Sequence, residues 1–151
     1  MDLELRAAFE EIVGFCVSNK QWDQATLPVK SSGMGLCSAS EIADAAYIAS
    51  RAQAFEDCKG LDNKHVWDNG EEREGGIVVL GEWLAGATRR YNERVPACSH
   101  ISGEVMEEGC KQGLLVDKLK VLRWRAMRDS AGQLEKARLE ATSASKSGTW
   151  F

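Results

Sequence analysis

Histidine, proline and long apolar runs are scarce in this sequence. Its 151 residues include two histidines, two prolines and fourteen glycines, which excludes a collagenous or proline-rich chain. No stretch approaches the 18 apolar residues that suggest a membrane-spanning helix. Residues 1–6 are acidic and amphipathic, unlike a secretory signal. We therefore expect no membrane association and an intracellular protein, cytoplasmic or nuclear.

Paired cysteines are also missing. The five cysteines are odd in number and widely spaced, without a Cys-x-x-Cys pair, and no Asn-x-Ser/Thr acceptor occurs. This pattern predicts free thiols in a reducing compartment rather than a disulfide framework. The strongest metal-ligand candidates are Cys98, His100 and Cys110, but a tetrahedral zinc site lacks a fourth ligand unless His65 or Cys58 folds over. We predict a loop without metal.

Signatures of catalysis are absent as well. The sequence has no Gly-x-Ser-x-Gly elbow and no Gly-Lys-Ser/Thr. The Gly33–Gly35 stretch is only the first half of a dinucleotide-binding fingerprint, and no strand is predicted before it. Adjacent carboxylates at Glu71–Glu72 and Glu107–Glu108 point about 100° apart on a helix and do not converge on one atom. We predict a protein that is not an enzyme and has no cofactor.

Apolar residues at helical spacing predict an all-α fold, with four to five helices in a single compact, bundle-like domain covering residues 1–151. The run Ile77–Leu80 suits a strand or a helix, and the pattern after it favours a helix that Pro96 ends. The other expected helices cover residues 3–17, 39–57, 101–111 and 114–141. Residues 22–37 are predicted as a loop, and residues 58–76 as a loop or a disordered insert.

Several local signals refine this prediction. Ser18 and Asn19 are expected to stop the first helix, whose buried stripe includes Phe9, Ile12 and Phe15. Ser38-x-x-Glu41 is a capping box at the start of the second, and the alanine-rich face behind it suits close helix packing. Trp83 falls on an apolar stripe and is predicted to lie in the core.

Charge is distributed unevenly along the chain. Residues 1–110 carry 10 basic and 19 acidic side chains, whereas residues 111–151 carry 9 basic and 4 acidic ones. The basic part has a cluster within eleven residues, interleaved with a tryptophan. A helix of this kind can neutralise phosphates and offer a stacking surface, although a solvated face is the alternative. The predicted nucleic-acid-binding residues are Lys118, Lys120, Arg123, Trp124, Arg125 and Arg128.

Three segments resemble reverse-transcriptase-like proteins of non-LTR retrotransposons. Residues 22–36 read W-D-Q-A-T-L-P-V-K-S-S-G-M-G-L, and residues 38–50 read S-A-S-E-I-A-D-A-A-Y-I-A-S. They are similar to a stretch that follows the polymerase palm in that family and leads into an alanine-rich helix. Residues 136–150, K-A-R-L-E-A-T-S-A-S-K-S-G-T-W, are similar to a later segment of the same family. Two positions differ from the family pattern: Ser32 stands where that family has a glycine, and Met34 stands where it has a leucine.

The resemblance implies a helical connector beyond the polymerase core. No Tyr-x-Asp-Asp occurs here, and a polymerase needs clustered aspartates to hold two magnesium ions. The expected function is therefore a non-catalytic helical domain that contacts nucleic acid through its basic helix. The alternatives are a protein-interaction module that forms homo-oligomers and, third, a small-molecule binder with a pocket between helices.

Overall fold

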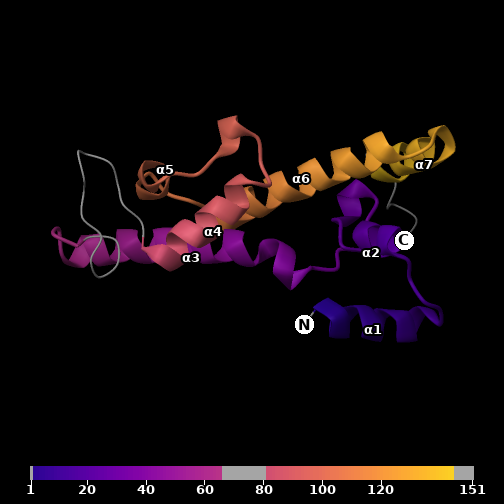
Figure 1. Cartoon of the computed structure of the whole chain (residues 1–151), viewed down its shortest axis with the longest axis horizontal. Coiled ribbons are helices and arrows are strands. Elements are labelled where there is room, and N and C mark those ends of the chain that lie inside the picture. The colour runs from indigo at the N-terminus through magenta and orange to yellow at the C-terminus, as the bar shows by residue number, and fades with distance from the viewer. Residues whose placement is uncertain (1, 66–80, 145–151) are drawn as a thin grey trace. The chain divides into compact units, whose positions relative to one another are not determined.

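All the regular secondary structure is helical in the computed structural model, which describes residues 2–65 and 81–144 (Figure 1). The all-α prediction is confirmed, but the described residues form seven α-helices, more than the four to five expected, and two 3₁₀ turns. Their bounds are α1 (Asp2–Val13), α2 (Asn19–Ala25), η1 (Val29–Ser31), α3 (Ala39–Leu61), α4 (Glu82–Asn92), η2 (Ala97–Ser99), α5 (Gly103–Glu107), α6 (Gln112–Ser130) and α7 (Gln133–Ser143).

One additional helix, α2, comes from a capping signal at Ser18. Its hydroxyl accepts a hydrogen bond from the Gln21 amide at 3.3 Å, and the Gln21 side chain accepts one from the Ser18 amide at 2.8 Å. This reciprocal capping box starts a helix within the predicted 22–37 loop. The preceding α1 ends at Val13 rather than residue 17 because Gly14 adopts a left-handed φ of +77°.

The other additional helix arises at Gly132. The expected single helix over residues 114–141 is two helices, since α6 ends at Ser130 and α7 begins at Gln133. Gly132 lies between them with an extended backbone (φ −67°, ψ 164°) and serves as the N-cap of α7. The second predicted helix extends to Leu61, so residues 58–61 of the predicted loop are helical. Residues 66–76 and the Ile77–Leu80 run lie outside the described residues.

The chain divides into two compact units. Among the described residues, the first unit comprises residues 2–41 and 120–144, which include α1, α2, η1, α7 and the C-terminal part of α6. Val17, Ala25, Leu27 and Leu139 are its buried apolar residues. The Ser32 hydroxyl donates to the Leu139 carbonyl at 2.7 Å and joins the loop after α2 to α7.

Polar contacts hold α1 in the first unit. The Asp2 carboxylate accepts from the backbone amides of Ala39 and Ser40 at 2.8 and 3.1 Å, and so caps α3. Further along α1, Glu10 accepts from the Val17 amide at 2.9 Å. No residue of α1 is buried.

The predicted burial of Ile12 and Phe15 is therefore wrong, since their exposed fractions are 83% and 57%. Phe9 fits its predicted stripe better: it is half-buried, and its ring lies 6.1 Å from the Trp22 ring. The hydrogen bonds of Asp2 and Glu10, near the two ends of α1, fix which side of the helix faces α2. Burial of its whole apolar stripe is therefore not needed to hold α1 in place.

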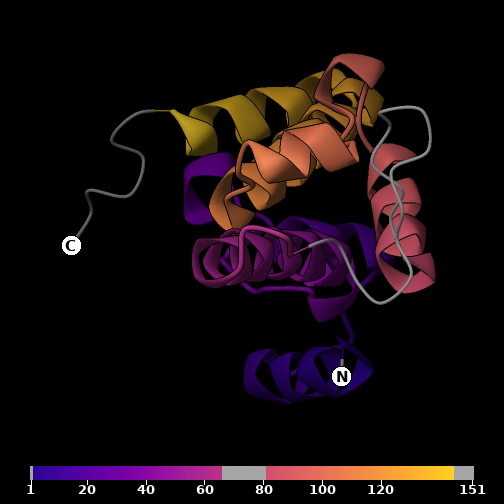
Figure 2. The ribbon, with the colours of Figure 1, turned by 90° about the vertical axis from the view of Figure 1, so that its left-hand side faces the viewer.

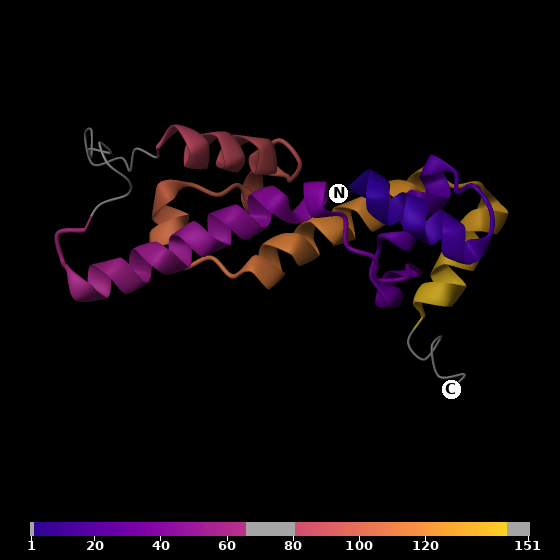
Figure 3. The ribbon, with the colours of Figure 1, turned by 90° about the horizontal axis from the view of Figure 1, so that it is seen from below.

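The second unit comprises residues 42–65 and 81–119. Figures 1 and 3 show α4 running alongside α3, where an ion pair of 2.6 Å joins Arg90 to Asp44. Small residues allow this close approach, as the alanine-rich sequence predicted. The buried residues of the two helices are Ala45, Ile48, Ala49, Ala52 and Phe55 of α3 and Leu84, Ala87, Thr88 and Tyr91 of α4.

Trp83 is the exception on α4. It was expected in the core, yet 83% of its surface is exposed. It precedes Leu84, whose exposed fraction is 0%, and neighbouring positions on a helix point about 100° apart. The four buried positions of α4 centre on one face, and Trp83 lies about 90° round the helix from that face, on its exposed flank.

Candidate nucleic-acid interface

The candidate interface lies on α6, a helix anchored by the buried residues Leu115 and Leu119. These leucines are four residues apart and therefore share one face. All six predicted site residues belong to this helix. They do not share a face, and the five basic residues among them divide into two groups.

The first group faces outward. Lys118 and Arg125 are exposed and lie seven residues apart, which places them about 10.5 Å apart along the helix on nearly the same side. Arg128 lies three residues further on the same side, with 32% of its side chain exposed. We call these three residues the basic row.

Two contacts orient Arg128 at the end of the basic row. Its guanidinium carbon lies 5.1 Å from the centre of the Trp124 ring, a cation–π contact. It also forms an ion pair of 3.0 Å with Asp129. Because the guanidinium covers one ring face, Trp124 supports Arg128 and offers less surface for stacking bases than the sequence predicts.

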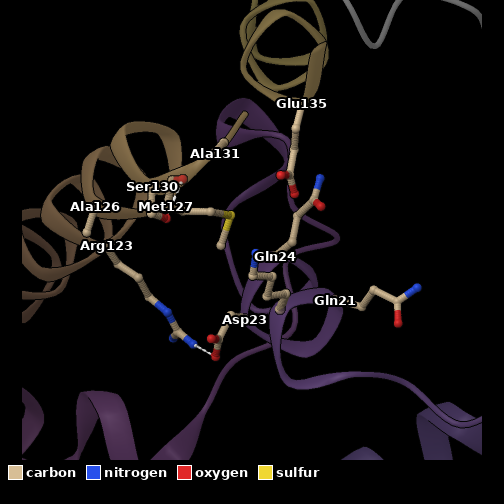
Figure 4. Close-up of a pocket in the computed structure, with 10 residues that line it drawn as sticks. Gln21, Asp23, Gln24, Arg123, Ala126, Met127, Ser130, Ala131 and Glu135 are labelled. Atoms are coloured by element: carbon tan, nitrogen blue, oxygen red, sulfur yellow. Dashed lines mark hydrogen bonds and ion pairs between the residues drawn. The ribbon is translucent and has the colours of Figure 1, made fainter. Parts of the chain in front are cut away.

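The second group, Lys120 and Arg123, faces away from the basic row. Each lies about 140–160° round the helix from Lys118, and both are half-buried. Arg123 pairs with Asp23 of α2 at 2.5 Å (Figure 4). It also pairs with Glu41 of α3. Its guanidinium thus joins α2, α6 and the first turn of α3, and is already engaged by two carboxylates.

A cleft opens beside Arg123 in the first unit. Its volume is about 390 Å³, and it lies between α2, α6 and the start of α7, as the labelled side chains in Figure 4 show. Lys20, Asp23 and Glu135 line it together with Met127. Sequence reasoning missed this cleft because its walls come from segments more than 90 residues apart, and no local motif marks it. Both basic and acidic side chains line the cleft, so its charge does not favour anionic ligands over cationic ones.

The candidate metal ligands do not converge. Cys98 and His100 are exposed, and within the described ranges no group of three His, Cys, Asp or Glu side chains is placed to hold a metal ion. Cys110 is half-buried, and burial raises the pKa of its thiol. A raised pKa disfavours the thiolate that zinc requires. The five cysteines are all free thiols in the structure.

Buried hydroxyl groups have structural roles in the second unit. Tyr91 is fully buried, and its hydroxyl donates to the Leu115 carbonyl at 3.3 Å. Burial raises the pKa of this phenol, which therefore remains protonated. The contact connects α4 to the N-terminal part of α6.

Comparison with known proteins assigns no family to the chain. No family profile, curated protein or solved structure matches it. Within residues 2–65 and 81–144, none of the helices has the length and apolar character needed to cross a bilayer.

Proposed function

We propose that this chain is a non-catalytic helical domain that contacts nucleic acid through the basic row of α6. The observation that carries the proposal is the placement of Lys118, Arg125 and Arg128 along one side of a single helix, where Lys118 and Arg125 are exposed and Arg128 is partly exposed. Three cations in a row about 15 Å long can each meet a phosphate of a nucleic-acid backbone. Such contacts position a protein on nucleic acid without reading its sequence.

We assign phosphate contact to a smaller set of residues than the six predicted from the sequence. Arg123 already has two carboxylate partners, and releasing it to bind a phosphate would break both ion pairs. Lys120 points to the same side as Arg123. We therefore propose that Lys118, Arg125 and Arg128 contact phosphates, that Trp124 positions Arg128, and that Arg123 stabilises the fold.

The sequence resemblance is compatible with this function. A connector that follows a polymerase core in a retroelement protein would lie near nucleic acid, and the resembling segments include α2, the start of α3 and α7. We propose that the chain derives from such a connector. Ancestry of this kind does not by itself specify a present function.

Charge reversal in the basic row tests the proposal. We expect Arg125→Glu to lower the affinity for a fluorescent oligonucleotide at least about tenfold at 50 mM salt, because it removes one phosphate contact and adds a repulsive charge. The matched control is Lys64→Glu, the same change at an exposed lysine outside α6, and it should bind as the wild type does. Fluorescence anisotropy measures both, and equal affinities of Arg125→Glu and wild type would contradict the proposal.

A further inference from the structure

The outward side of α1 is acidic and complements the basic row in spacing. Glu4 and Glu11 are exposed and lie seven residues apart, the same interval as that between Lys118 and Arg125. Seven residues correspond to about 10.5 Å along a helix in both cases. The α1 helix as a whole carries four acidic residues and one basic residue.

The two helix faces also complement each other in shape. Ala7 and Ala8 lie between the glutamates of α1 and are exposed. On α6, Val121 lies between Lys118 and Arg125, and 42% of its surface is exposed. In a contact between the two faces, the larger Val121 would meet the small alanines, which would allow the helix axes to approach closely.

Within the first unit, the outer face of α1 is turned away from the C-terminal part of α6. In the first unit, α1 lies on one side of α2, and α7 with the end of α6 lies on the other (Figures 1 and 2). The inner side of α1 faces α2 through the Phe9–Trp22 contact, so its glutamates point away from α6. Glu11 and Arg125 are both exposed, so a second molecule can reach them.

We infer that a second copy of this chain docks the outer face of its α1, through Glu4 and Glu11, onto Lys118, Val121 and Arg125 of α6. The contact joins two different faces and is heterologous. One helix lying on another buries less than the roughly 1,600 Å² of a standard interface, so we expect weak association that salt screens. Nucleic acid and the second copy would compete for α6, but the inference does not depend on nucleic-acid binding.

A charge-swap experiment tests this contact without nucleic acid. Sedimentation equilibrium of the full chain at 50 mM salt should show a weight-average mass that rises with concentration. Glu11→Lys and Arg125→Glu should each weaken association at least about tenfold, because like charges then face each other. The control Glu56→Lys makes the same change on exposed α3 and should associate like wild type.

The combined variants provide the decisive comparison. The double variant Glu11→Lys/Arg125→Glu, and an equimolar mixture of the two single variants, should both recover association because opposite charges meet again. Circular dichroism verifies that each variant retains its helices. A wild type that stays monomeric up to millimolar concentration, or a helical double variant that fails to recover association, would overturn the inference.

Discussion

Gly33 follows the left-handed residue Ser32 in the loop that folds back over α2. A Cβ atom at this position would lie 1.9 Å from the carbonyl oxygen of Leu27, a residue with no exposed surface. Neither backbone can move easily, because the Gly35 amide donates to the same carbonyl at 2.9 Å. The glycine requirement is therefore steric.

Two glycine-to-alanine substitutions should have opposite effects on stability. We expect Gly33→Ala to lower the free energy of unfolding by about 2 kcal/mol or more, the upper range for overpacking. Gly113→Ala, in α6 with open space around its Cβ position, should raise it by up to about 1 kcal/mol through helix propensity. Urea denaturation followed by circular dichroism measures both, and changes of the same sign would contradict this account.

Asp2 couples stability to pH. Hydrogen bonds from the hydroxyls of Ser40 and Ser38, with others from backbone amides, hold the pKa of its carboxyl well below the usual value. A carboxyl whose pKa is lower in the folded state stabilises the protein above its unfolded pKa, about 3.9. That contribution is lost progressively as the pH falls below about 4.

Asp2→Asn should remove this dependence. The amide keeps one acceptor but has no charge, so we expect a loss of about 1 kcal/mol at pH 7, typical of a helix cap. The difference in unfolding free energy between wild type and variant should shrink between pH 5 and pH 2. Urea titrations across this range measure it, and a difference that does not change with pH would show that the carboxylate charge does not stabilise the cap.

At the scale of elements, Arg123 stabilises the junction of α2, α3 and α6. Its side chain is 25% exposed and pairs with Asp23 and Glu41. We expect Arg123→Gln to lower the free energy of unfolding by about 1–2 kcal/mol, between the values for exposed and buried ion pairs. Arg125→Gln, two residues away and exposed, should change it by less than about 0.5 kcal/mol. Equal effects in chemical denaturation would show that the ion pairs do not stabilise the junction.

The helices themselves were predictable where the chain follows one apolar period. The alanine-rich face expected behind Ser38 is the buried side of α3, whose buried residues are Ala45, Ile48, Ala49, Ala52 and Phe55. Helix ends were less predictable because the same residue type can either end one helix or cap the start of the next. Ser18 can end a helix or cap the next, and only Gln21 three residues later favours the cap.

The candidate site was predictable only in part, for a physical reason. The cluster of basic residues on α6 is visible in the sequence, and helical geometry separates the basic row from Lys120 and Arg123. The partners of Arg123 are not visible, since Asp23 and Glu41 lie 100 and 82 residues away. Long-range ion pairs depend on tertiary structure, which local patterns do not specify.

At the scale of the whole molecule, the separation of charge along the sequence has two consequences. The acidic N-terminal helix and the basic α6 give the chain complementary faces, and the basic row gives it a surface for polyanions. Both proposals use Arg125, but only self-association uses Glu11. Glu11→Lys should therefore weaken self-association and preserve nucleic-acid binding, which separates the two.

The salt dependence of nucleic-acid binding tests the central claim most directly. Three phosphate contacts predict that log affinity falls by about 2.1–2.7 per log unit of salt, so affinity should drop about 20- to 40-fold between 50 and 200 mM. Fluorescence anisotropy with single- and double-stranded oligonucleotides measures this slope. We predict a slope in this range for the wild type. In Arg125→Glu the slope should be smaller by about 0.7–0.9, the contribution of one phosphate contact. Absence of binding at 50 mM salt, or an affinity that salt does not change, would contradict it.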